Sequence, residues 1–235
     1  MPGPLALVGG DELNPGNEPQ DRILVEAADG GPAYVIATAA ARQRPDLAVA
    51  NAKRWFGGLG LEVEELPLTR RSHATSKEVA ERAREGRFFY LVGGDPGLVP
   101  KVLGDSAAWT AIVEAWRGGA ALAGSSAGAM ALGSWTLIRD RMPGDDRRRY
   151  REALGLVPDI AVIPHLSTFG ERWIPSALEA APDGAILLGI DERTAAVFVD
   201  GSWRVEGPGS VIVITGSDRR TFADGAGIEG VPLPG

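Results

Sequence analysis

Residues 120–130 read Ala120-Ala121-Leu122-Ala123-Gly124-Ser125-Ser126-Ala127-Gly128-Ala129-Met130. An apolar run of strand length ends in Gly-Ser-Ser-Ala-Gly, and an Ala- and Met-rich segment that can open a helix follows. A strand, a sharp turn and a helix in this order form a nucleophile elbow, in which glycines tolerate the strained turn and leave room for a substrate. The pattern therefore predicts Ser126 as a nucleophile. The alternative is a glycine-rich turn in which the serine is incidental.

The composition limits the kinds of protein that this chain can be. Its 235 residues, 44% of them hydrophobic, suit one α/β domain over residues 1–235 with a sizeable core. A formal net charge of −7 argues against nucleic acid as a partner. No apolar run approaches the roughly 18–20 residues that span a bilayer, and no charged N-terminal segment precedes an apolar one. We therefore expect no membrane span and a cytoplasmic location.

Few residues of the kinds that usually carry chemistry are present. The chain has no cysteine, which excludes disulfides, thiolate metal sites and a cysteine nucleophile. It has two histidines, His73 and His165, so only these two are candidates for a histidine general base, and a histidine-rich metal site is implausible. We expect no requirement for a metal ion or an organic cofactor.

Strands and helices alternate through the first half of the chain. Apolar runs predict strands at residues 5–8, 33–38, 61–68 (at or near an edge) and 88–92, and before the elbow. Helical spacing and capping signals predict helices over residues 21–28, 45–57, 75–86, 98–103 and 107–116. Because the apolar runs are continuous and separated by helices, we expect an α/β fold in which a mostly parallel sheet carries helices on both faces.

The pattern changes after the elbow. Residues 139–151 are charged and contain Pro143-Gly144, which predicts an exposed loop entering a helix. Further strands are expected at residues 160–164, 185–190, 194–199, 202–206 and 210–215, with a hairpin turn at Asp200-Gly201 and the last of these ending the sheet. We therefore expect a C-terminal antiparallel hairpin unit, followed by a loosely held Gly/Pro-rich tail over residues 223–235. We find no internal repeat and no domain linker.

Three of the predicted strands end in loops that can form a site together. Gly93-Gly94-Asp95, Gly124-Ser125-Ser126 and His165 each follow a strand, and ligands of open parallel sheets bind beyond the carboxyl ends of the strands. A serine nucleophile needs a base within hydrogen-bond reach, and His165 lies between an apolar strand and a polar loop. We favour it over His73, whose Arg-rich loop is typical of a solvated surface. A buried structural role is the alternative for His165.

An oxyanion hole needs two N–H donors aimed at the developing negative charge. The backbone N–H of Ala127, directly after the nucleophile, is one natural donor. Gly94 or Asp95, in the loop after a neighbouring strand, is expected to supply the second. The composition of residues 93–97 also fits a simple turn with a helix cap.

Four motifs together resemble those of a known family. They are Gly124–Ala129, Val92-Gly93-Gly94-Asp95, Pro164-His165 and Gly189-Ile190-Asp191-Glu192-Arg193-Thr194-Ala195. In this order, within residues 5–215, they resemble the peptidase E and cyanophycinase family of serine peptidases. The resemblance implies a flavodoxin-like fold of the class I glutamine amidotransferase type, with Ser126 as the nucleophile and His165 as the base. Glutamine amidotransferases themselves use a cysteine at the elbow, so the absence of cysteine disfavours glutamine hydrolysis.

The resemblance also suggests an acid that orients His165. The family places an acidic residue after the serine, and Asp140 lies fourteen positions after Ser126. Asp140-Arg141-Met142-Pro143 looks similar to the aspartate-bearing segment of peptidase E, and this carboxylate would stabilise the imidazolium. The alternatives for the acid are Asp145, Asp146 and Glu192. The segment is also typical of a charged loop that only faces water.

Around the histidine the chain departs from the cyanophycinase pattern. Cyanophycinase-like members carry an aspartate two residues before the histidine and an aromatic residue after it, where this chain has Ile163 and Leu166. Their downstream arginine cluster is reduced here to Arg172. An acidic substrate side chain would need a basic partner, for which Arg172 and Arg139 are the candidates. Either arginine is otherwise a surface residue.

The sequence therefore predicts a serine hydrolase that cleaves the amide bond of a small peptide, such as an aspartyl dipeptide, through an acyl-enzyme. One alternative is a cyanophycinase-like exopeptidase that releases β-aspartyl-arginine. The other is a non-catalytic amidotransferase-like protein that binds a small molecule or a partner. We weigh a homodimer joined through Trp173 or Trp203 against packing of these rings in the core, and favour the core.

Overall fold

The structure is a computed structural model that describes residues 1–139 and 146–235. Its strands are β1 (Leu5–Val8), β2 (Ala33–Ile36), β3 (Glu64–Glu65), β4 (Phe88–Leu91), β5 (Ala121–Ser125), β6 (Gly133–Arg139), β7 (Arg148–Glu152), β8 (Val157–Ile163), β9 (Ile186–Ile190), β10 (Ala195–Val199), β11 (Ser202–Glu206), β12 (Ser210–Thr215) and β13 (Asp218–Ala223). Its helices are α1 (Glu18–Ala28), α2 (Pro45–Gly58), α3 (Arg71–Ala74), α4 (Lys77–Glu85), α5 (Leu98–Leu103), α6 (Ala107–Arg117), α7 (Ala127–Leu132), α8 (Ile174–Glu179) and the short 3-10 helix η1 (Gly170–Trp173).

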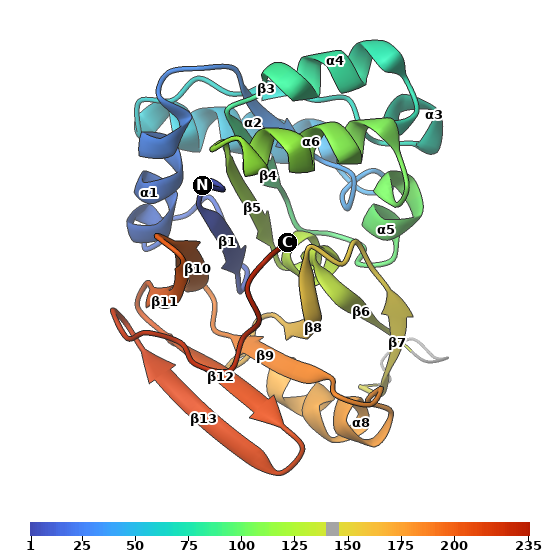
Figure 1. Cartoon of the computed structure of the whole chain (residues 1–235), viewed down its shortest axis with the longest axis vertical. Coiled ribbons are helices and arrows are strands. Elements are labelled where there is room, and N and C mark those ends of the chain that lie inside the picture. Colours follow the sequence, from blue (N-terminus) through green and yellow to red (C-terminus); the bar gives the residue numbers. More distant parts are fainter. Residues whose placement is uncertain (140–145) are drawn as a thin grey trace.

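The first of two sheets contains the parallel strands that the sequence predicts (Figure 1). Its strand order is β11-β10-β1-β5-β4-β2-β3, and β1 to β5 all run parallel, with the two-residue strand β3 at the edge. β10 joins β1 antiparallel, and the predicted turn at Asp200-Gly201 leads to β11. One face of this sheet packs against α1 and α2, and the other against α4, α6 and α7.

The expected mostly parallel sheet accounts for only part of the molecule, because the chain forms a second, mixed sheet. Its order is β13-β12-β9-β8-β6-β7, in which β6, β8 and β9 run parallel and the other neighbours are antiparallel. Residues 148–152 are therefore strand β7 and not part of a loop and helix. Tyr150 packs edge-on against Trp135 of β6, and Arg148 lies over Trp173, so this charged strand still buries one side.

Two expectations about the C-terminal part are wrong. β12 is not the last strand, since β13 pairs with it antiparallel. The tail is also not loosely held, because Ile228 and Val231 are buried and the indole Nε1 of Trp203 donates to the Pro232 carbonyl at 2.9 Å. The Gly235 N–H donates to the Leu156 carbonyl, just before β8. The tail thus contacts both sheets.

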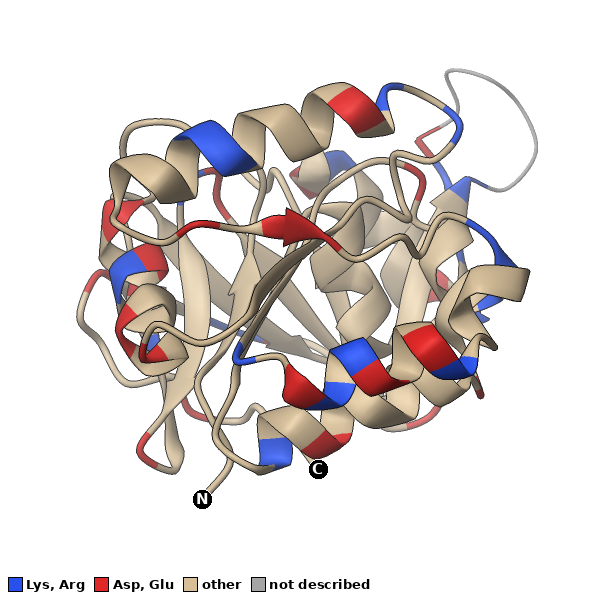
Figure 2. Ribbon diagram, turned by 90° about the horizontal axis from the view of Figure 1, so that it is seen from above, with Lys and Arg blue, Asp and Glu red and all other residues tan. Residues whose placement is uncertain are grey.

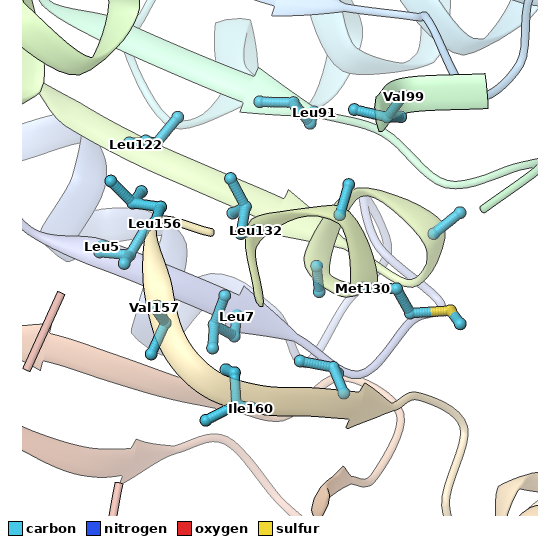
Figure 3. Packing of buried hydrophobic residues seen from close by; sticks show 14 of the residues in the cluster. Leu5, Leu7, Leu91, Val99, Leu122, Met130, Leu132, Leu156, Val157 and Ile160 are labelled. Atoms are coloured by element: carbon cyan, nitrogen blue, oxygen red, sulfur yellow. The ribbon is translucent and has the colours of Figure 1, made fainter. Parts of the chain in front are cut away.

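Helix α7, which follows the elbow, lies between the two sheets. All of its residues are buried. Figure 3 shows Met130 and Leu132 of α7 in the same hydrophobic cluster as Leu7 of β1 and Ile160 of β8. Burying a side chain of this size contributes about 1.5–3 kcal/mol, so the packing holds the helix firmly against both sheets.

Charged residues occur mainly in the outer helices and loops, and the edge strand β3 consists of two glutamates (Figure 2). Trp173 and Trp203 are both buried, which confirms the core position favoured for them. In the part of the chain that the structure describes, no helix has the length and apolar character needed to cross a bilayer.

Candidate active site

Ser126 lies at the strained turn between β5 and α7. Its φ of 50° and ψ of −113° are unusual for a residue with a side chain, and such a conformation costs on the order of 1–3 kcal/mol. Its N–H donates to the Val8 carbonyl at 2.9 Å. A Cβ on Gly128 would lie 2.3 Å from the Leu91 carbonyl oxygen, and one on Gly124 would meet Gly128 at 2.5 Å. The two glycines therefore allow α7 to pack directly onto β5 and β4.

A chain of two hydrogen bonds links Ser126 to a carboxylate. The Ser126 hydroxyl oxygen lies 3.0 Å from Nε2 of His165, on the loop after β8. Oε1 of Glu192, on the loop after β9, lies 2.7 Å from Nδ1 of the same imidazole. When Nδ1 carries the proton that binds the carboxylate, Nε2 is free to accept the serine proton. The order carboxylate, imidazole, hydroxyl is that of a catalytic triad.

Glu192 is one of the alternatives that the sequence left open for the acid. The first choice, Asp140, and the alternative Asp145 lie outside the residues that the structure describes. Asp146 is exposed. Glu192 is thus the acidic candidate that the structure brings into contact with His165.

The imidazole of His165 is held on several sides. Its ring stacks on Phe169, with the centroids 4.7 Å apart and the planes inclined by 23°. The backbone N–H of His165 donates to the Gly9 carbonyl at 2.6 Å. A Cβ on Gly10 would lie 2.2 Å from Cε1 of the ring, so the close approach requires glycine there. His73, in α3, does not line the pocket that contains Ser126.

The proposed oxyanion donors differ in what their N–H groups contact. Asp95 uses its N–H in a 2.8 Å hydrogen bond to the Ala39 carbonyl. The Gly94 N–H has no acceptor within residues 1–139 and 146–235, so of the two alternatives Gly94 keeps an available donor. Ala127 is the first residue of α7, where a backbone N–H has no acceptor within the helix.

Ser126 and His165 open into a pocket of about 460 Å³. Gly94, Asp95, Ala127 and Arg139 also line it, and its remaining wall includes the largely apolar side chains of Met130, Leu137, Ile138, Phe169 and Trp173. Among the charged lining residues, the sequence did not point to Arg148, because its charged segment looked fully solvated. The Arg148 side chain is buried, with its guanidinium 4.0 Å from the centre of the Trp173 ring.

Arg172, the other arginine predicted to bind substrate, is not in this pocket. It is exposed and lines a separate shallow depression with Glu171 and Arg219. A larger depression of about 790 Å³ lies by β2, β3 and α2, but the catalytic candidates are not among its lining residues. Of the two predicted basic residues, only Arg139 is therefore placed to meet a substrate at Ser126.

Known proteins resemble this chain over most of its length. The model of peptidase family S51 matches residues 5–205. A cyanophycinase of Trichormus variabilis is 31% identical over 216 residues, which cover 88% of this chain and 72% of that protein. A cyanophycinase of Synechococcus elongatus is 28% identical over 200 residues, or 82% of this chain and 62% of that protein.

Two solved structures resemble the fold. A peptidase from an acI-B1 Actinobacterium has a TM-score of 0.85 and 30% identity, with 97% of each chain covered. A putative peptidase E of Listeria monocytogenes EGD-e has a TM-score of 0.60 and covers 95% of this chain and 99% of its own. At 20% identity the latter supports the fold alone.

Proposed function

The chain belongs to peptidase family S51, a family of serine-type hydrolases, and we propose that it uses Ser126 to cleave the amide bond of a small peptide through an acyl-enzyme. The observation that carries the proposal is the pair of hydrogen bonds from Glu192 to His165 and from His165 to Ser126. The pocket in front of Ser126 supports it, because a substrate carbonyl can reach the hydroxyl there.

In the first step the Ser126 hydroxyl oxygen attacks the carbonyl carbon of the substrate amide. Nε2 of His165 takes the hydroxyl proton as the new C–O bond forms, and Glu192 stabilises the resulting imidazolium through Nδ1. The negative charge moves to the former carbonyl oxygen, where the N–H groups of Ala127 and Gly94 are the proposed donors.

The tetrahedral intermediate then loses the amine. The C–N bond breaks, the leaving nitrogen takes the proton from Nε2 of His165, and an ester on Ser126 remains. A water molecule gives a proton to the imidazole as its oxygen attacks the ester. Collapse of this second intermediate releases the carboxylic acid and returns the proton to Ser126.

We propose that the preferred substrate carries an acidic side chain, as an aspartyl dipeptide does. Arg139 lines the pocket and can bind a carboxylate through charge-assisted hydrogen bonds. The largely apolar wall around Met130, Phe169 and Trp173 suits the rest of a short peptide. Arg172 has no part in this proposal, because it lies outside the pocket.

A cyanophycinase-like exopeptidase is the second candidate, since cyanophycinases are among the similar proteins. Ile163 and Leu166 stand where such enzymes have an aspartate and an aromatic residue, so we favour the small-peptide substrate. Purified protein offered cyanophycin and a panel of aspartyl dipeptides should hydrolyse the dipeptides. Release of β-aspartyl-arginine from the polymer would instead support the second candidate.

The nucleophile can be tested without knowing the substrate. A fluorophosphonate should add once to the wild-type protein, as seen by intact-mass spectrometry, because the hydroxyl of Ser126 is activated by His165. Ser126→Ala should remain unlabelled, while Ser202→Ala, which removes an exposed hydroxyl from β11, should label like the wild type. Folded wild-type protein that stays unlabelled at every pH would contradict the proposed function.

A further inference from the structure

We propose that Glu12 is a positioning residue that fixes the oxyanion loop, residues 93–95, against the serine elbow. The inference rests on the proposed function, because it concerns how the same site is assembled. Glu12 lies in the loop after β1 and is half-buried. The sequence reasoning gave it no role, since nothing in the local pattern around Glu12 points to strand ends so distant in the chain.

The carboxylate of Glu12 bridges two other strand ends. Its Oε1 accepts a hydrogen bond from the Gly93 N–H, after β4, at 2.8 Å. Its Oε2 accepts one from the hydroxyl of Ser125, the last residue of β5, at 2.9 Å. These partners are 81 and 113 residues away in sequence. One carboxylate therefore joins the carboxyl ends of β1, β4 and β5, which form the part of the site that contains Ser126 and the oxyanion loop.

The oxyanion loop is anchored on both sides of Gly94. Glu12 holds the Gly93 N–H, and the Ala39 carbonyl holds the Asp95 N–H. Gly94 itself has a φ of +146°, a conformation that only glycine adopts readily. Because glycine has wide backbone freedom, an unrestrained Gly94 would change this conformation easily. Because the peptides on either side are held, the direction of the Gly94 N–H is set before a substrate arrives.

Glu12 also acts on the nucleophile's side of the site. Ser125 is fully buried and directly precedes Ser126, so its hydrogen bond to Glu12 restrains the chain at the strained turn. A Cβ on Gly93 would lie 3.0 Å from Oε1 of Glu12 and 3.3 Å from Cβ of Ser126. Carboxylate, loop and nucleophile are thus packed together. Glu12 sets the distance between the oxyanion donor and the serine through these neighbours.

The first test measures the rate at which a fluorophosphonate labels Ser126. Glu12→Ala should slow labelling by on the order of 100-fold or more, because a misdirected oxyanion donor costs about as much as a missing one. Glu12→Gln should stay within about threefold of the wild type, since its amide oxygen can still accept from Gly93 and its nitrogen can donate to Ser125. The matched control is Glu18→Ala, which removes a carboxylate that accepts the Gly16 N–H at the start of α1.

The pattern of rates separates positioning from other roles. The pH profile of labelling should keep its shape in Glu12→Gln, because His165 and Glu192 are untouched. A folded Glu12→Ala protein that labels at the wild-type rate would overturn the proposal. So would a Glu12→Gln protein as slow as Glu12→Ala, because the charge and not the hydrogen bonding would then be responsible.

A second measurement does not depend on activity. Hydrogen–deuterium exchange should become faster in peptides that cover residues 93–95 in Glu12→Ala and stay at the wild-type rate in Glu18→Ala. Unchanged exchange in Glu12→Ala would refute the anchoring whether or not Ser126 reacts. Wild-type protein that fails to label would refute the proposed function, and exchange alone would then decide the role of Glu12.

Discussion

Glu192 is the residue whose contact would set the tautomer of His165, the proposed base. Its Oε1 lies 2.7 Å from Nδ1 of His165, so the carboxylate fixes the tautomer in which Nε2 faces Ser126. Removing the negative charge of Glu192 would leave His165 without an anionic partner once its imidazole has taken the proton of Ser126. Positioning and charge stabilisation would then be lost together.

We therefore expect Glu192→Gln to lower kcat by on the order of 10²–10⁴-fold while KM changes little. The measurement is steady-state hydrolysis of the best dipeptide from the panel, with the thermal midpoint as a check on folding. Asp146→Asn, which changes an exposed acidic residue, is the matched control and should keep the wild-type rate. Equal activity in Glu192→Gln and the wild type would exclude Glu192 as the acid of the triad.

Asp21 provides a second prediction at the scale of a single residue. Burial raises the pKa of its carboxyl from 3.8 to about 7, although Oδ2 accepts a 2.7 Å hydrogen bond from Nε1 of Trp55. The folded state thus favours the protonated carboxyl. The contribution of Asp21 to the free energy of unfolding is therefore greatest below pH 3.8, where the carboxyl is protonated in both the folded and the unfolded state. Between that pH and about 7, the free energy of unfolding should fall by up to about 1.4 kcal/mol per pH unit.

Asp21→Asn keeps an acceptor for Trp55 and removes the charge, so its urea stability should depend less on pH over this range. The difference from the wild type should grow as the pH rises toward about 7 and beyond. Asp29→Asn, at the exposed end of α1, is the control. Parallel pH profiles for Asp21→Asn and the wild type would contradict a buried, protonated Asp21.

The sequence points to those site residues whose expected role can be inferred from their neighbours in the chain. Ser126 is surrounded by the glycines of its own turn, and His165 follows its own apolar strand, so both could be found from local patterns. Glu192 was only an alternative, because its contact with His165 depends on how β8 and β9 lie side by side. Glu12 was missed since its two partners lie at the ends of other strands, β4 and β5, far away in sequence. Arg172 was misjudged because nearness in sequence to the histidine does not fix where a side chain points.

At the scale of elements, the elbow depends on α7 lying directly on the strands before it. A Cβ on Gly128 would come within 2.3 Å of a backbone oxygen, that of Leu91, which cannot move aside alone. We expect Gly128→Ala to destabilise the protein by about 1–3 kcal/mol and to slow labelling of Ser126, because the helix must shift. Urea unfolding and the fluorophosphonate rate measure the two effects.

Gly57→Ala is the matched control for this prediction. Gly57 lies within α2, and a Cβ there would meet nothing within 4 Å. The substitution should stabilise the protein by about 0.5–1 kcal/mol, because alanine is the better helix former. Loss of stability in Gly57→Ala equal to that in Gly128→Ala would mean that the close approach to Leu91 is not the cause.

Elements with strong local signals were predicted well, and elements that depend on distant partners were not. The capping box Thr75-Ser76-Lys77-Glu78 predicts a helix, and the structure has helix α4 there. The capping residue is Ser76 and not Thr75, since the Ser76 hydroxyl accepts from the Val79 N–H. The sequence did not predict strands β6 and β7. β7 is rich in arginine, which is typical of a loop, and it is stabilised by pairing with β6. Strand pairing of this kind outweighs the tendency of charged residues to lie in loops.

At the scale of the whole molecule, the tail contributes to stability by contacting both sheets. Ile228 is buried, and its N–H donates to the Trp203 carbonyl of β11. Ile228→Ala should therefore cost about 2–5 kcal/mol in urea unfolding. Leu233→Ala, in the same tail but with a side chain that is 61% exposed, should cost little. Similar small effects in both variants would show that the tail does not support the fold.

The proposed triad is divided between the two sheets. Ser126 follows a strand of the first sheet, whereas His165 and Glu192 follow strands of the second, and α7 is packed between them. Neither sheet alone carries all three residues, so the proposed hydrolysis depends on how the two sheets are aligned with each other. A small shift of one sheet relative to the other would therefore stop the proposed hydrolysis while leaving every strand intact. The rate of hydrolysis should thus respond to changes in that alignment more sensitively than the content of secondary structure does.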